Sequence, residues 1–259
     1  MFVAFGVGVL VLMGQVTIAG VGGPPTGPQS AAVLFGGLFG VIAAGTLVVS
    51  TAERRAWERA GRRAGLESEG GVLPFLKPDL VGHVRGREVR ARTKTRGSSG
   101  GESNSTRSYT IVETQLRGTP AVGLVGLRQR ASVFGGTASG LEGLSAPRVT
   151  VGEFTVLGPA EGFIQAVFSP RVQSALDDTE VSRVYVGDAA GTLTDATDLS
   201  DSVLGGLAAK GIAAGVPGDA TTVSVVRRGV ALESDDLERQ IQAVVELAEA
   251  FEAAAAEAS

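Results

Sequence analysis

The first 52 residues of the chain contain no charged side chain, and Glu53 is the first residue that carries one. All 50 Asp, Glu, Lys and Arg residues therefore lie in the last 207 positions. Two apolar runs fill the uncharged part, at about residues 2–21 and 31–49, each with 14 apolar residues and four glycines. A helix over either run would be about 30 Å long, the thickness of the hydrocarbon core of a bilayer. We therefore expect residues 1–52 to form two transmembrane helices.

The segment that joins the two runs, Gly22–Ser30, holds three prolines and three glycines. These residues cannot continue a helix, so the two spans are expected to form an antiparallel hairpin. A cleavable signal peptide over residues 1–20 is the competing interpretation. Against this interpretation, no basic residue precedes the apolar run and no clear cleavage site follows it.

Small residues recur every four positions along the second run, at Gly36, Gly40 and Ala44. Such a stripe allows two helices to approach closely. The stripe predicts helix packing, either within the hairpin or between copies of the chain in a homo-oligomer.

Five arginines and the only tryptophan follow the second run: Arg54, Arg55, Trp57, Arg59, Arg62 and Arg63. Basic residues beside a span favour the cytoplasmic side, so we expect a multi-pass protein of the cell membrane with residues 53–259 in the cytoplasm. Residues 53–70 are predicted to form a basic juxtamembrane helix on anionic headgroups, with Trp57 at headgroup level. A solvated helix that continues the second span is the alternative.

Beyond the basic segment the pattern predicts alternating strands, polar loops and helices. We expect an antiparallel β region over 71–130, with a hairpin of Leu80–Val84 and Val89–Thr95, then a linker over 131–148 rich in Gly and Ser. Residues 149–259 are predicted to form an α+β region that ends in an amphipathic helix capped by Ser234. The expected fold class is a membrane-anchored α+β protein, with a transmembrane hairpin, a small antiparallel β region and a C-terminal α+β region.

The order of these features resembles a known family, through four short motifs: Ala64-Gly65-Leu66, Asp79-Leu-Val-Gly82, Gly86-Arg-Glu-Val89 and Tyr109-Thr-Ile-Val-Glu113. They are similar to motifs of uncharacterised prokaryotic membrane proteins of archaeal type, with two N-terminal spans and a cytosolic domain of unknown function. The resemblance implies a location and assigns no catalytic residue.

No set of residues predicts a catalytic, cofactor or metal site. Ser99 matches G-x-S-x-G, but it lies in a polar loop and not at a strand-to-helix turn. The chain has one histidine, His83, and no cysteine, so the usual ligands of transition metals are scarce. Two groups of acidic residues could be imagined to bind calcium, but neither has the spacing of a calcium loop. The first group is Asp195, Asp198 and Asp201, and the second is Asp177, Asp178 and Glu180.

Six basic residues gather on the predicted hairpin: Arg85, Arg87, Arg90, Arg92, Lys94 and Arg96. We interpret them as a solvated or lipid-facing surface, with an acidic protein partner as the second interpretation. Nucleic acid is not expected as a partner, because the hairpin has no aromatic side chain on which bases would stack.

The sequence supplies charged surfaces and an amphipathic C-terminal helix, which suffice for a binding protein, whereas the proton-transfer and nucleophilic residues of an enzyme are scarce and poorly placed. Residues 53–130 carry 16 basic and 8 acidic side chains, and residues 131–259 carry 7 and 19. We expect an integral membrane protein that acts as a non-catalytic, cytosol-facing interaction or assembly module. Its expected partners are anionic lipids and either further copies of the chain or another membrane protein. The alternatives are a membrane-associated hydrolase and a subunit of a small oligomeric pore.

Overall fold

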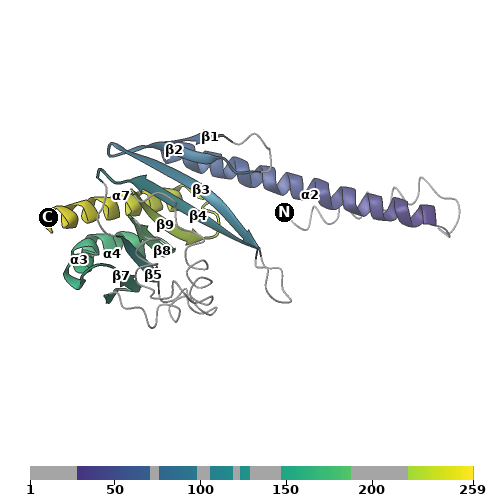
Figure 1. Ribbon diagram of the computed structural model, residues 1–259. Coiled ribbons are helices and arrows are strands. Elements are labelled where there is room, and N and C mark those ends of the chain that lie inside the picture. The colour runs from purple at the N-terminus through teal and green to yellow at the C-terminus, as the bar shows by residue number, and fades with distance from the viewer. Residues whose placement is uncertain are drawn as a thin grey trace. The chain divides into compact units, whose positions relative to one another are not determined.

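The computed structural model describes residues 28–70, 76–97, 106–118, 123–128, 147–187 and 221–258, without the side chains of residues 28–43, 96–97 and 106–107. The described residues form two compact units, of which the first holds residues 28–54 and Leu76 and the second holds the remainder. Figure 1 labels these elements except β6. They are α2 (Pro28–Arg63), β1 (Leu66–Glu69), β2 (Asp79–Val84), β3 (Arg87–Gly97), β4 (Thr106–Gln115), β5 (Leu124–Arg128), β6 (Arg148–Val151), β7 (Phe154–Leu157), α3 (Glu161–Val167), α4 (Pro170–Asp177), β8 (Val181–Val186), β9 (Thr222–Arg228) and α7 (Ser234–Glu257).

The first unit contains the greater part of α2. Three consecutive apolar side chains on this part, Leu47, Val48 and Val49, are each about half exposed. Successive residues of a helix point about 100° apart, so these three present an apolar surface around much of the helix.

The second unit is built on one nine-stranded antiparallel sheet in the order β1-β2-β3-β4-β9-β8-β5-β7-β6. Strands β1 to β4 follow one another as a meander. The pairing of β4 with β9 joins this meander to the other five strands, with Val112 opposite Val225. The α+β character expected from the sequence is confirmed.

The turn between β2 and β3 consists of Arg85 and Gly86, which both have positive φ, at 52° and 72°. A two-residue turn with this geometry matches the twist of the paired strands, so it fixes their register. Gly82 of β2 accordingly lies opposite Val89 of β3. The hairpin predicted from the alternating sequence is confirmed.

Helices α3, α4 and α7 lie together on one face of the sheet, as Figure 1 shows. Alternate strand residues point to opposite faces, and on β4 the side chain of Val112 belongs to the core beneath these helices. Its neighbour Ile111 belongs to a second buried cluster with Val125, Tyr185 and Val226. Both faces of the central strands are therefore buried.

Helix α7 contributes the apolar stripe that the sequence predicts. All five members are buried: Leu237, Ile241, Val244, Ala248 and Phe251. Its predicted cap is wrong, because Glu233 occupies the cap position and Ser234 is the first helical residue. The hydroxyl of Ser234 donates instead to the carboxylate of Asp235.

The predicted fold class is wrong in its N-terminal part. Within the residues that the structure describes, no helix is long and apolar enough to cross a membrane. The first predicted span, residues 2–21, lies outside the described residues. The second, residues 31–49, is the beginning of α2, which continues without a break to Arg63. The absence of charge predicted a helix that stops at a bilayer surface, whereas the helix extends into the basic segment and packs there on the sheet.

The predicted division into an antiparallel β region and a C-terminal α+β region is also wrong, because the described strands of both belong to a single sheet. Strand β4 from the first region pairs with β9 from the second, across more than 100 residues of sequence. The predicted α+β region begins with two short strands, β6 and β7, which are joined by a turn at Gly152. Residues 129–146, which hold most of the predicted linker, lie outside the described residues. Local periodicity contains no information about such distant pairing.

Candidate functional site

The last turns of α2 are fixed to strand β2 by close packing. The indole of Trp57 is fully buried, and its Nε1 donates a hydrogen bond of 2.8 Å to the carbonyl oxygen of Pro78. Gly61 allows the helix backbone to approach, since a Cβ at that position would lie 2.6 Å from Cδ1 of Leu80. These contacts determine which side of the helix faces outward.

The outward side of these turns carries four exposed arginines, which we call the arginine face: Arg55, Arg59, Arg62 and Arg63. Nε of Arg59 donates to the carbonyl oxygen of Arg55 at 3.1 Å, which aligns this side chain along the helix. Arg54 is half-buried and takes part in an interaction within the fold. Four of the six residues predicted to lie at a membrane surface thus share one face, and Trp57 is placed in the core.

The stripe predicted for helix packing lies on α2. Ala44 is exposed there, and the exposure of Gly36 and Gly40 lies outside the description.

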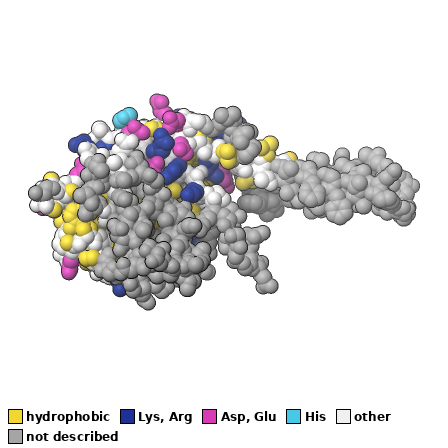
Figure 2. Space-filling model, viewed as in Figure 1, with side chains coloured by type: hydrophobic (Ala, Val, Ile, Leu, Met, Phe, Trp, Pro, Cys, Tyr) yellow, Lys and Arg dark blue, Asp and Glu magenta, His cyan; other side chains and the backbone are white. Residues whose placement is uncertain are grey.

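The predicted basic hairpin surface is divided between several environments. Arg85 lies at the turn, and Arg87 is buried on one face of the sheet. Arg90 and Arg92 point to the other face of the sheet. Arg90 lies 3.2 Å from Glu69, and Arg92 lies 3.1 Å from Glu113. Lys94 also takes part in an interaction, and the side chain of Arg96 is outside the description. Figure 2 shows the resulting alternation of basic and acidic side chains on the described surface.

Arg87, whose side chain is 3% exposed, forms a buried ion pair. Its Nη1 and Nη2 donate to Glu252 of α7 at 2.8 and 2.6 Å, and Nη1 also donates to the carbonyl oxygen of Gln115. Hydrogen bonding from Arg87 is the main cause of the lowered pKa of Glu252, with the backbone N–H of Arg117 as a further donor. This pair connects β3 to the C-terminal half of α7.

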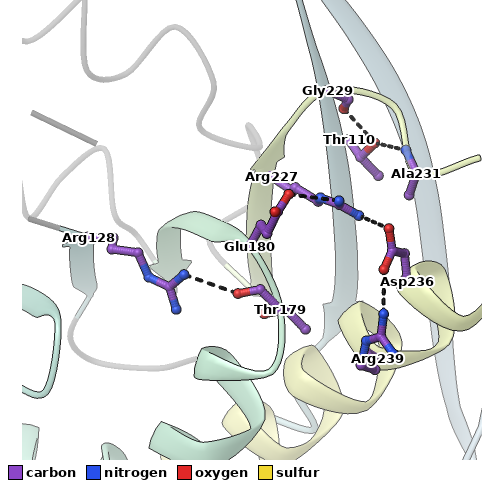
Figure 3. Close-up of polar contacts among 9 residues, drawn as sticks. All are labelled: Thr110, Arg128, Thr179, Glu180, Arg227, Gly229, Ala231, Asp236 and Arg239. Carbon is purple, nitrogen blue, oxygen red and sulfur yellow. Dashed lines mark hydrogen bonds and ion pairs between the residues drawn. The ribbon is translucent and has the colours of Figure 1, made fainter. Parts of the chain in front are cut away.

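A second ion-pair network connects the other end of α7 to the sheet (Figure 3). Arg227 of β9 lies 2.6 Å from Asp236 and 2.8 Å from Glu180, and Asp236 also accepts a hydrogen bond from Arg239. Partial burial raises the pKa of Asp236, but the hydrogen bonds from Arg227 and Arg239 outweigh it, so the pKa lies below its ordinary value. These contacts fix the start of α7 against β9.

Two further residues drawn in Figure 3, Thr110 and Arg128, connect elements through hydrogen bonds. The hydroxyl of Thr110 donates to the carbonyl oxygen of Gly229 and accepts from the N–H of Ala231, both at 2.9 Å. Arg128 donates to the carbonyl oxygens of Leu176 and Thr179 at the end of α4. A cation at a helix C-terminus satisfies carbonyls that lack a partner within the helix.

A cleft of about 840 Å³ lies between the end of α2, α4 and the first half of α7. Glu246 lies at this cleft and accepts contacts from Arg85 at 3.7 Å and from Arg171 at 3.0 Å. The charged lining is mixed, with three arginines and four carboxylates: Arg63, Arg171, Arg239, Asp178, Asp235, Glu238 and Glu246. Charges of both signs oppose one another here, so the cleft presents no uniform field to a charged ligand.

The residues weighed for chemistry do not converge in the described part of the chain. His83 is exposed on β2, Asp177 pairs with Arg128, and Glu180 pairs with Arg227. Ser99 and the group of Asp195, Asp198 and Asp201 lie outside the described residues. Among the described residues, no group of three or more His, Cys, Asp and Glu side chains is arranged to hold a metal ion.

Sequence reasoning missed the structural role of Arg87 and Arg227. Their partners, Glu252 and Asp236, lie 165 and 9 residues away. One signal was available, because Glu246, Glu249 and Glu252 recur every three residues and so form a polar row beside the apolar stripe of α7.

The fold and the arginine face define an α+β protein with a single antiparallel sheet and a basic helix surface. No protein-family model matches the chain, and no curated protein matches its sequence. Among solved structures, the chain is similar to the crystal structure of the mycobacterial trehalose monomycolate transport factor A, TtfA. The sequence identity is 10%, the match covers 77% of this chain and 94% of that one, and the TM-score is 0.41.

Proposed function

We propose that this chain is a non-catalytic interaction or assembly module that binds an anionic partner through the arginine face of α2. The observation that carries this proposal is the exposure of four arginines on one side of a helix whose other side is fixed to β2 by Trp57 and Gly61. Guanidinium groups donate paired hydrogen bonds to carboxylate and phosphate oxygens, and they keep their charge at all physiological pH values.

The use of other arginines within the fold supports this assignment. Arg87, Arg128 and Arg227 each join two or more elements through their hydrogen bonds. Charged groups in exposed positions contribute little to stability. The arginine face is therefore available to a partner at little cost in folding free energy. A location of this module in the cytoplasm stays a prediction.

Retention of the full chain on immobilised heparin, a soluble polyanion, tests the proposal. We expect the wild type to elute at a higher salt concentration than a variant in which Arg55, Arg59, Arg62 and Arg63 are all replaced by Gln. The difference arises because each arginine adds a contact with the polyanion that is screened by salt.

The matched control replaces four exposed arginines outside the arginine face by Gln, namely Arg148, Arg171, Arg228 and Arg239. This control has the same net charge as the first variant. We expect it to elute close to the wild type. Equal elution of the two variants, or no retention of the wild type, would show that the arginine face is not a binding surface.

A further inference from the structure

We infer that the anionic partner of the arginine face is the surface of a lipid bilayer that contains anionic headgroups. This inference rests on the proposed function and adds the class of partner. In this inference the helix contacts the headgroup layer from the aqueous side.

The charges on this face are close together and of one sign. Arg55 and Arg63 are separated by eight residues, a rise of about 12 Å along the helix. The two acidic residues of the same segment, Glu53 and Glu58, are half-buried and take part in interactions within the fold. Four exposed guanidinium groups over this distance are expected to produce a positive potential that extends about one Debye length, some 10 Å at 0.1 M salt. Glu233 and Asp235 reduce this potential beside Arg59 and Arg63, so it is strongest over Arg55 and Arg62.

The shape of the surface favours mobile anions over one fixed anion. A depression of about 320 Å³ beside Arg59 and Arg63 is also lined by Glu233 and Asp235. These carboxylates repel a single phosphate or carboxylate group that enters the depression. Lipid headgroups form a layer whose members rearrange, so they can contact the projecting arginines without entering it.

The position of the arginine face in the sequence favours a lipid surface over an acidic protein. The face begins at Arg55, two residues after the end of the 52-residue run that has no charged side chain. A basic helix segment directly beside a strongly apolar sequence is typical of segments at a bilayer surface. An acidic protein partner would need no such neighbour.

Sedimentation of the full chain with lipid vesicles tests this inference. One vesicle preparation contains phosphatidylcholine and phosphatidylglycerol, and the other contains phosphatidylcholine alone. We expect tighter binding to the anionic vesicles, and a loss of about 600-fold in that affinity when the four arginines of the face are replaced by Gln. Each arginine near an anionic leaflet contributes about fivefold, so four can account for a loss of this size.

Two variants serve as controls. Replacing the same four arginines by Lys should preserve binding to anionic vesicles, because a diffuse field depends on charge and not on the planar guanidinium group. The Gln variant of Arg148, Arg171, Arg228 and Arg239 should bind like the wild type. Inorganic phosphate should weaken binding only as much as sodium chloride of equal ionic strength.

Three results would overturn the inference. They are equal binding to both vesicle types, equal loss in the two Gln variants, and displacement by phosphate beyond the effect of ionic strength, which indicates a discrete phosphate site. If heparin retention depends on the arginine face while vesicle binding does not, the lipid partner is wrong and the proposed interaction function stands. If neither depends on it, both are wrong.

Discussion

At the scale of single residues, the side chain of Arg87 shows how a charge is accommodated inside this fold. Its side chain is 3% exposed, and its guanidinium group meets both carboxylate oxygens of Glu252 and a backbone carbonyl. Removing one member of a buried pair leaves the other without its partner in a poorly solvated place. The four arginines of the arginine face have the opposite environment, because water solvates them.

Replacement of Arg87 by Met is therefore expected to lower the free energy of unfolding by about 2–3 kcal/mol. This loss is smaller than the loss on breaking a fully buried pair, because Glu252 is 25% exposed. Chemical denaturation measures the loss. The matched control is Arg55→Met on the arginine face, for which we expect a change within about 0.5 kcal/mol. A similar small loss for both variants would mean that the pair of Arg87 and Glu252 does not stabilise the fold.

The lowered pKa of Glu252 predicts a loss of stability in acid. A carboxyl group whose pKa is lower in the folded state than in the unfolded state binds fewer protons when folded. Its contribution is complete above the ordinary value of 4.5 and is lost as the pH falls through the folded-state pKa. Denaturation midpoints measured from pH 7 to acid should therefore fall less steeply in Glu252→Gln than in the wild type. A parallel decline in both proteins would contradict this role of Glu252.

At the scale of elements, the contact of α2 with β2 decides where the arginine face lies. Gly61 provides the space for this contact, and Leu80 fills it with a side chain that is fully buried. Trp57 adds a hydrogen bond to Pro78 that only this packing provides. A change at Gly61 thus affects the orientation of the whole helix end.

Replacement of Gly61 by Ala should destabilise the protein by about 1–3 kcal/mol, because the new methyl group would overlap Leu80. Gly162→Ala in α3 is the matched control, since a Cβ there meets nothing within 4 Å. Alanine is the better helix former, so the control should be about 0.5–1 kcal/mol more stable than the wild type. Thermal or chemical denaturation of both variants tests the contact, and stabilisation in both would disprove it.

The sequence predicted most elements correctly where their signal is local. The β2–β3 hairpin follows from alternating residues around Arg85 and Gly86, and α7 follows from its apolar stripe. The burial of Trp57 could not be predicted, because a tryptophan beside arginines is equally typical of a membrane surface. Strand order could not be predicted either, since β4 meets β9 across a segment that includes β5 to β8.

At the scale of the whole molecule, the continuous sheet leads us to expect that the second unit unfolds cooperatively. The pairing of β4 with β9 and the core beneath α7 connect Trp57 near one edge to Ile164 near the other. Trp57 is the only tryptophan, so its fluorescence reports on one end of the sheet.

Replacement of Ile164 by Ala should therefore shift the unfolding transition detected at Trp57, although the two residues belong to different elements. Ile164 is fully buried, so we expect a loss of about 2–5 kcal/mol. Tryptophan fluorescence and circular dichroism should report the same midpoint. A shift seen by circular dichroism alone would show that the two ends unfold independently.

The central claim is that the arginine face contacts an anionic bilayer surface, and a fluorescent label on this face tests it most directly. The chain contains no cysteine, so Arg59→Cys and the control Arg171→Cys each create one labelling site for an environment-sensitive dye. Both positions are exposed. We predict a shift to shorter emission wavelength at position 59 when vesicles containing phosphatidylglycerol are added, no shift there with phosphatidylcholine alone, and no shift at position 171 with either. An unchanged spectrum at position 59, or equal shifts at both positions, would contradict the account.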